Sequence, residues 1–143
     1  MVSKREGVVR FGISLPGELQ KRFDRLIKEK GYANRSEALR DLMREMLVRK
    51  EWERADQEVA GTITLVYNHH QRELVSRLTE IQHNYHQIII SGQHVHLDHD
   101  NCLEVVIMKG RASQVLSLGQ RLRAVKGVKF GEVTMASTGR TLK

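Results

Sequence analysis

Residues 9–16 read Val-Arg-Phe-Gly-Ile-Ser-Leu-Pro, and apolar and polar side chains alternate along them. A period of two residues is typical of a β-strand with one buried face. One face of this predicted strand is apolar, and the other carries Arg10, Gly12 and Ser14. Pro16, the single proline of the chain, suits the first turn of a helix. The sequence therefore predicts a short strand that leads directly into a helix.

Two helices are predicted after this strand. Apolar residues recur at helical spacing until Gly31, which ends the first helix. Asn34 and Glu37 stand at the spacing of a capping box, which marks the start of the second helix. Residues 8–53 are therefore predicted to form one strand-helix-helix domain.

A domain of this kind needs a partner. One strand and two helices bury too little apolar surface to fold alone, and the strand has two unpaired edges. In a two-fold dimer, antiparallel pairing of two copies buries the apolar face and exposes a polar ribbon. Such a ribbon fits the DNA major groove, where Arg10 and Ser14 can bond base edges, and the helix start at Asn34 and Ser36 can bind a phosphate. The alternative is that the strand is only a solvated sheet edge.

The segments RFGISLP and GYANRSEALRDLM resemble the ribbon-helix-helix repressors, as the ribbon and as the turn into the second helix. The resemblance implies DNA binding by a dimeric β-ribbon. The charge agrees with an anionic partner, because 24 Lys and Arg against 17 Asp and Glu give a net charge of +7. Most of that excess lies in residues 1–54.

Composition excludes several other classes of protein. No apolar run approaches the roughly 20 residues that a membrane span needs, and the first residues lack the apolar segment of a signal peptide. The single cysteine, Cys102, excludes an internal disulfide and fits a reducing compartment. We therefore expect a soluble cytoplasmic protein with no membrane partner.

The second half of the chain predicts a different fold. Strands and helices alternate in the order βαββαβ, which is the ferredoxin-like arrangement. Residues 60–137 are predicted to form this domain, so the whole chain is α+β. The segments that carry the pattern are 63–67, 74–81, 88–108, 115–122 and 128–135.

The predicted hairpin within this domain contains HVHLDHDNC, residues 94–102. His94 and His96 are two residues apart and therefore point to the same face of a strand. If the connection has an odd length, His96 faces Cys102, His94 faces Glu104, and all four side chains share one face. Two imidazoles and a thiolate suit nickel, copper or zinc better than magnesium or calcium. The alternative is a polar hairpin with a small buried cysteine.

The chain as a whole resembles the nickel-responsive transcriptional regulators of the NikR family, whose C-terminal domain is of the ACT type. The segments that carry this resemblance beyond the ribbon are NRSEALRD, VYNHHQREL, IQHNYH, HVHLDHDNCLEV and GVKFGEV. The resemblance implies one Ni(II) per subunit, with His94, His96 and Cys102 as ligands and His83 as a fourth ligand from another subunit. It also implies a homotetramer built as a dimer of dimers.

The resemblance further implies residues around the nickel site and a second site. Tyr67, His69 and Glu104 belong to the surroundings of the nickel, although ordinary strand packing explains Tyr67 and Glu104 equally well. Glu37 and Asp41 are implied as ligands of a second cation between the domains. Without the resemblance these two acids, four residues apart, are helix-surface residues.

The function implied is nickel-dependent repression of nickel-uptake genes through a palindromic operator in double-stranded DNA. Gly12 departs from the family, whose members often carry Thr or Ser there, so base readout depends more on Arg10 and Ser14. Gln71-Arg72 stands where some members of the family carry two basic residues, which leaves Arg72 as the phosphate contact. The alternatives are a regulator that responds to copper or zinc, a metalloenzyme, and a nickel store or chaperone. We expect neither catalysis nor a small organic substrate.

Overall fold

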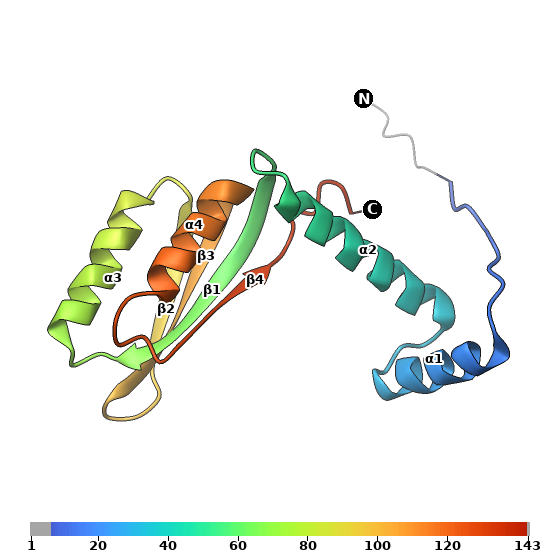
Figure 1. The fold of residues 1–143 in the computed structure, drawn as a ribbon, viewed down its shortest axis with the longest axis horizontal. Helices are drawn as coiled ribbons and strands as arrows, with labels where there is room; N and C mark the ends of the chain where they lie inside the picture. Colours follow the sequence, from blue (N-terminus) through green and yellow to red (C-terminus); the bar gives the residue numbers. More distant parts are fainter. Residues whose placement is uncertain (1–6, 143) are drawn as a thin grey trace. The chain divides into compact units, whose positions relative to one another are not determined.

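The computed structural model describes residues 7–142, which form four helices and four strands (Figure 1). The chain divides into two compact units after Leu42. None of the helices within these residues combines the length and apolar character that crossing a lipid bilayer requires. In chain order the elements are α1 (Gly17–Glu29), α2 (Arg35–Glu53), β1 (Glu58–Asn68), α3 (Arg72–Asn84), β2 (Ile89–His96), β3 (Asn101–Arg111), α4 (Ala112–Arg123) and β4 (Phe130–Met135).

The first unit contains the two helices that the sequence predicts. Gly31 follows α1 with φ +79, a left-handed conformation that favours glycine. Asn34 caps α2, because its side-chain oxygen accepts a hydrogen bond of 2.9 Å from the backbone N–H of Glu37. Arg35 donates two hydrogen bonds of 2.7 Å to Asp24 and so ties the start of α2 to α1. The pKa of the Asp24 carboxyl is lowered by these bonds.

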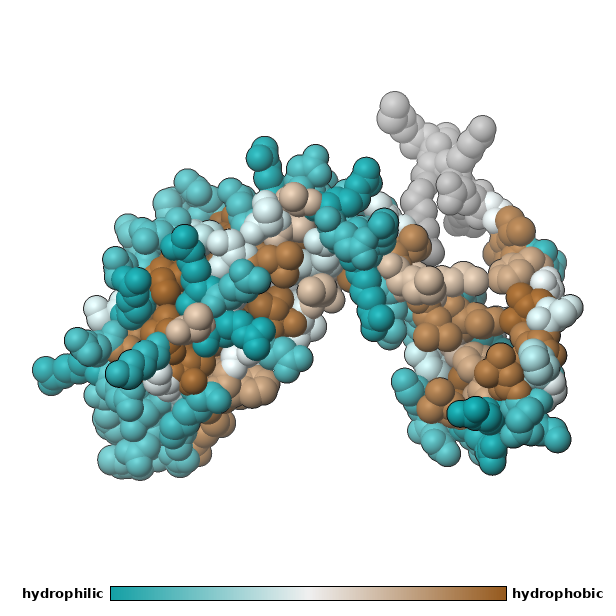
Figure 2. Space-filling view, in the orientation of Figure 1, coloured by the Kyte–Doolittle hydropathy of each residue, from teal (hydrophilic) through white to brown (hydrophobic). Residues whose placement is uncertain are grey.

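Residues 7–16 form no strand in this single chain. The strand predicted over residues 9–15 is therefore absent here, since a strand needs a second strand to accept and donate its hydrogen bonds. Phe11 is 65% exposed and Ile13 is 57% exposed. Figure 2 shows apolar residues at the surface in the region of α1. Leu19 and Leu26 of this helix are 54% and 47% exposed. The predicted apolar faces exist but remain uncovered in one copy of the chain.

The second unit has the predicted ferredoxin-like topology. Its four strands form an antiparallel sheet in the order β2-β3-β1-β4. Helices α3 and α4 cover one face of this sheet (Figure 1). Alternate residues of β1 are buried beneath the helices, among them Ile63 and Leu65, which have no exposed surface. Leu118 of α4 and Val106 of β3 complete the same core.

The second half of α2 packs with the second unit. Trp52 is only 4% exposed and its indole N–H donates a hydrogen bond of 2.8 Å to the carbonyl of Ala136. Val48 packs against the same core. The sequence-derived boundaries, 8–53 and 60–137, assign all of α2 to the first domain, whereas packing assigns its last turns to the second unit.

Gly119 lets α4 approach β4 closely. A Cβ atom at this position would lie 2.4 Å from Cγ2 of Val133. We expect Gly119→Ala to lower the free energy of unfolding by about 1–3 kcal/mol through overpacking. Urea unfolding followed by circular dichroism measures the change.

The matched control is Gly17→Ala, because a Cβ at Gly17 meets nothing within 4 Å. Trimming the neighbour should relieve the clash, so Gly119→Ala combined with Val133→Ala should cost less than the sum of the single changes. A strictly additive double variant, or a Gly119→Ala protein as stable as the control, would contradict this packing.

Candidate metal centre

The hairpin of β2 and β3 has the register that an odd-length connection predicts. His94 lies opposite Glu104 and His96 lies opposite Cys102. The N–H of Leu97 donates a hydrogen bond of 2.9 Å to the carbonyl of Asn101, so the connection is residues 98–100. Opposite residues of an antiparallel pair project to the same face. The two imidazoles, the thiol and the carboxylate therefore share one face of the sheet.

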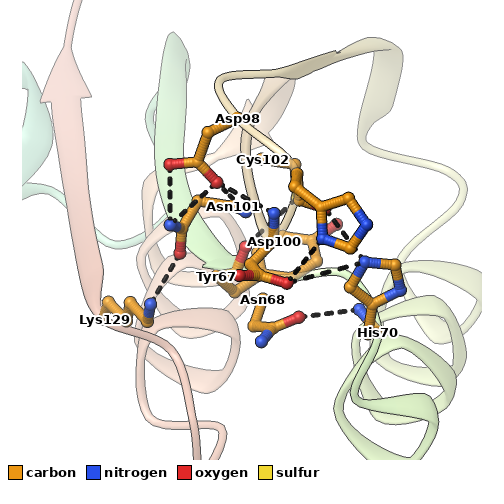
Figure 3. A network of polar contacts seen from close by, with 9 residues as sticks. Tyr67, Asn68, His70, Asp98, Asp100, Asn101, Cys102 and Lys129 are labelled. Atoms are coloured by element: carbon orange, nitrogen blue, oxygen red, sulfur yellow. Dashed lines mark hydrogen bonds and ion pairs between the residues drawn. The ribbon is translucent and has the colours of Figure 1, made fainter.

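Asp98 fixes the connection (Figure 3). Its carboxylate accepts hydrogen bonds from the side chain and the backbone N–H of Asn101, and from the backbone N–H of Asp100. These bonds, led by the Asn101 side chain, lower the pKa of Asp98 to about 2. Asn101 in turn accepts a hydrogen bond of 2.6 Å from Nζ of Lys129. The turn that sets the register is thus held by its own side chains.

Cys102 is held as a neutral thiol. Its side chain is fully buried, and Sγ donates a hydrogen bond of 3.4 Å to the carbonyl of Tyr67. Burial raises the pKa of the Cys102 thiol above its usual range. A metal that binds this sulfur must therefore displace a proton.

Glu104 connects the hairpin to the helical layer. It accepts a hydrogen bond of 2.6 Å from the hydroxyl of Tyr67 and one of 3.0 Å from Nε2 of Gln82, a residue of α3. Burial is the largest cause that raises the pKa of the Tyr67 hydroxyl, and the hydrogen bond to Glu104 is the second. The Tyr67 ring also makes an edge contact with His94 at 6.1 Å between centroids. Tyr67 and Glu104 thus lie beside His94 and Cys102.

His69 lies against the hairpin as well. Its ring stacks on His96 with 4.4 Å between centroids, and the rings of His94 and His96 are 5.4 Å apart. Nδ1 of His69 is buried without a hydrogen-bond partner in the described part of the chain. Burial, and next the neighbouring imidazole of His70, lower the pKa of His69. An unpartnered imidazole nitrogen beside the rings of His70 and His96 fits the surroundings of a borderline transition metal.

The single chain does not bring the four predicted ligands together. His83 lies exposed in the last turn of α3, where His86 is its ring neighbour at 6.0 Å. Among the described residues, the group with three donor atoms within 4.8 Å of one another is a different one, formed by His70, His99 and Asp100. In this chain the sulfur of Cys102 points to a carbonyl, and the ring of His96 stacks on His69.

Sequence patterns assign no role to His70 or His99. The signal that could have joined them is the tandem His69-His70 at the end of the first strand of this domain, next to the predicted hairpin turn. Periodicity could not use it, because the two histidines come from loops and 29 residues separate His70 from His99.

The residues predicted to contact DNA lie at the surface of the single chain. Arg10, Gly12 and Ser14 are exposed in the segment before α1, Ser36 is exposed at the start of α2, and Arg72 is exposed at the start of α3. The side-chain oxygen of Asn34 is already engaged in capping α2. Only its neighbouring N–H groups and its own amide NH₂ remain for a phosphate.

Glu37 and Asp41, the residues implied for a second cation, lie one turn apart on α2. Asp41 accepts a hydrogen bond of 2.9 Å from the hydroxyl of Tyr32. Glu37 is exposed and carries the N–H that Asn34 caps. Among residues 7–42, no group of three His, Cys, Asp or Glu donors includes either of these acids.

Comparison with known proteins covers nearly the whole chain. Residues 60–136 match the family described as NikR C terminal nickel binding domain, and residues 9–50 match the ribbon-helix-helix family of copG type. A protein of Thermococcus onnurineus named "Putative nickel-responsive regulator" is 56% identical over 94% of this chain and 98% of its own length. A protein with the same name from Pyrococcus furiosus is 53% identical over 95% of this chain and 99% of its own length. Another, from Nitratidesulfovibrio vulgaris, is 56% identical over 94% of this chain and 96% of its own length. A solved structure of an uncharacterized protein from Thermotoga maritima has a TM-score of 0.49 and 14% identity, covering 54% of this chain and 95% of its own, which is too distant to carry an argument.

The burial of Cys102 makes its reactivity a test of the metal-free site. We expect the native thiol to react with a chromogenic disulfide reagent at pH 8 at least about tenfold more slowly than the urea-unfolded thiol. Because the pKa of the thiol is raised, the native rate should increase as the pH rises past the ordinary thiol range. Stopped-flow absorbance measures both rates, and the Cys102→Ser variant, which has no thiol, gives the background absorbance change. Equal rates in native and unfolded protein would show that the sulfur is accessible.

Proposed function

The chain belongs to the NikR family of nickel-responsive regulators, and from that premise we propose that it is a nickel-dependent repressor that binds a palindromic DNA operator. Its relatives carry the name of regulators, and its two matched domains are for DNA binding and nickel binding, not for catalysis. The repressor role, the operator and the control of nickel-uptake genes are the parts that we propose.

The hairpin register is the observation that carries the proposal. It aims His94, His96 and Cys102 from paired strands to one face. We assign these residues as nickel ligands, with Tyr67, His69 and Glu104 orienting or enclosing them. Two nitrogens and one thiolate suit Ni(II), and geometry must select against Cu(II), which binds such donors more tightly.

The fourth ligand in the proposal is His83 of a second subunit. It is exposed at the end of α3, so it is free to reach another copy of the chain. Nickel would then bridge subunits, and each chain would hold one ion. A bridge of this kind favours the assembled state by its binding free energy.

The exposed apolar residues of the first unit support a dimer of this domain. Phe11 and Ile13 are more than half exposed in one chain, and antiparallel pairing of residues 9–15 with a second copy would bury them. The same pairing would present Arg10, Gly12 and Ser14 to a major groove. Two such dimers around four C-terminal ACT-type domains make the proposed homotetramer.

Coupling between nickel and DNA follows from this assembly. If nickel favours one placement of the two ribbons, it tightens binding to a palindrome by its differential affinity for that placement. A coupling free energy of about 1–3 kcal/mol corresponds to about 5- to 150-fold. We further propose that Glu37 and Asp41 bind a second cation between the domains. We also propose that the protein works in the cytoplasm, where its operator is.

His83 and His86 provide a matched pair for testing the bridging ligand, because both are exposed histidines near the end of α3. We expect His83→Ala to weaken Ni(II) binding at least about tenfold without unfolding the protein, and His86→Ala to change it little. Calorimetric titration of the full chain with Ni(II) gives both affinities. Equal effects of the two substitutions would argue against a ligand at His83.

Arg10 tests the ribbon. Arg10→Ala should weaken binding to a nickel-uptake promoter fragment at least about tenfold at fixed salt and saturating nickel, since a bidentate contact to guanine contributes about 1–3 kcal/mol per base. Nickel binding should be unchanged. Fluorescence anisotropy with labelled promoter and unrelated DNA separates specific from non-specific affinity.

The control for this experiment is Arg22→Ala, which removes the same charge from the exposed surface of α1. It should lower specific and non-specific affinity by a similar small factor. If Arg10→Ala binds the promoter as well as this control does, the ribbon assignment is wrong.

A further inference from the structure

The segment that follows β4 lies against the last turns of α2 and takes no part in the proposed nickel or DNA contacts. The hydroxyl of Ser137 donates a hydrogen bond of 3.2 Å to Oε2 of Glu51, and the hydroxyl of Thr141 donates one to Oε1 of the same carboxylate. Glu51 belongs to α2, so residues 137–141 are joined to this helix at both ends (Figure 1). We refer to Glu51 and residues 137–141 as the Glu51 clamp.

Trp52, the next residue of α2, fixes the start of the same segment. Its indole N–H donates a hydrogen bond of 2.8 Å to the carbonyl of Ala136, and its side chain is buried. The N–H of Ala136 in turn donates a hydrogen bond of 3.0 Å to the carbonyl of Ala60 in β1. A Cβ atom at Gly61 would lie 3.0 Å from two atoms of the Trp52 ring, so the ring rests directly on the backbone of β1. Two successive side chains of α2 therefore hold this segment.

The segment has a turn of its own, which brings Thr141 back to the carboxylate that Ser137 already contacts. Gly139 lies in this turn with φ +79, and its N–H donates a hydrogen bond of 3.1 Å to the hydroxyl oxygen of Ser137. The guanidinium of Arg140 lies 3.4 Å from the carboxylate of Glu58, the first residue of β1. The turn thus joins α2 to the start of β1.

A simpler explanation is that an exposed segment only lies against the nearest polar side chains. Exposed ion pairs, such as that of Arg140 with Glu58, contribute little to stability. Glu51 and Ser137 are partly buried, however, and a single carboxylate accepts from two hydroxyls. Hydrogen bonds to a carboxylate are stronger than those between neutral groups. The clamp is therefore a specific contact between α2 and the segment after β4.

The clamp acts on a helix that runs through both compact units. The boundary between the units follows Leu42, whereas α2 extends from Arg35 to Glu53. Sharp kinks in helices need a proline, a glycine or a similar interruption, and α2 contains neither of these residues. The contacts that hold its last turns therefore set the direction in which α2 leaves the second unit.

The clamp is far from the proposed nickel ligands. It lies at the Glu58 end of β1, whereas Asn68 at the other end of β1 pairs with Asn101 beside the hairpin connection. A strand of 11 residues separates these ends by about 30 Å. A change in the clamp can therefore leave the nickel ligands undisturbed.

We propose that Glu51 is a positioning residue for DNA binding, because its clamp on residues 137–141 fixes the direction of α2 and so transmits the nickel-dependent arrangement of the C-terminal domains to the ribbons. The inference rests on the proposed function, since it concerns the coupling of nickel to DNA. Without the clamp, the last turns of α2 take more than one direction, and nickel favours the placement that fits the operator by a smaller factor.

Trp52 gives a direct measurement of the clamp, because it is the single tryptophan of the chain. Glu51→Ala in the full chain should raise the acrylamide quenching constant of Trp52 fluorescence at least about twofold by local opening. The matched control is Glu53→Ala, which removes a carboxylate that flanks Trp52 on the other side and pairs with Lys50 at the surface. The control should leave the quenching constant unchanged.

A second variant removes the other half of the clamp. Ser137→Ala combined with Thr141→Val deletes both hydroxyls and should raise the quenching constant as Glu51→Ala does. Because the three side chains form one contact, adding Glu51→Ala to this variant should change the constant no further.

The functional measurement is the ratio of affinities for a labelled nickel-uptake promoter fragment with saturating Ni(II) and without metal, at fixed salt. Glu51→Ala should lower this ratio at least about threefold. Its Ni(II) affinity by calorimetric titration should equal that of the wild type, and Glu53→Ala should retain the wild-type ratio. A residue needed only for stability would not move the ratio while nickel affinity stays unchanged.

Two results would overturn the inference. One is a quenching constant that is the same in Glu51→Ala, in the hydroxyl variant and in the Glu53→Ala control. The other is a nickel-dependent ratio that Glu51→Ala leaves equal to that of the wild type. A wild type whose DNA affinity does not respond to nickel contradicts the proposed function and the role of the clamp together, whereas an equal response in wild type and Glu51→Ala contradicts the clamp alone.

Discussion

The antiparallel register of β2 and β3 is the constraint on which the candidate metal centre depends. His96 lies opposite Cys102 because residues 98–100 form a three-residue connection. A shift of one residue would turn one strand over and separate the imidazoles from the thiol by the thickness of the sheet. The carboxylate of Asp98 holds that connection through several donors, so a residue that contacts no metal sets the spacing of those that would.

The helical layer extends this constraint beyond the hairpin. Glu104 bonds both Tyr67 of the neighbouring strand and Gln82 of α3, one residue before His83. A displacement of Glu104 at the hairpin face can therefore shift Gln82 and the end of α3, where the proposed intersubunit ligand lies. This contact network is a physical route by which metal could influence subunit placement, although coupling itself is a property of the assembly.

Local patterns sufficed to predict much of this molecule. Alternation in β1, helical spacing in α3 and α4, and the Asn34 cap are determined by neighbours in the chain, and the structure has them at the expected places. The hairpin register was predicted only for a connection of odd length, and the structure has a connection of three residues. The strand predicted over residues 9–15 is absent from the single chain, because none of the described residues pairs with it there. The meeting of His70 with His99 was missed, because it depends on how two loops pack.

The central claim is that the hairpin holds nickel through two imidazoles and the thiolate of Cys102. X-ray absorption at the nickel edge, on the full chain loaded with one equivalent of Ni(II), tests it directly. We expect one sulfur neighbour together with nitrogen neighbours that show imidazole scattering. A spectrum with only nitrogen and oxygen neighbours would contradict the account, because it would leave Cys102 as a buried thiol of the core.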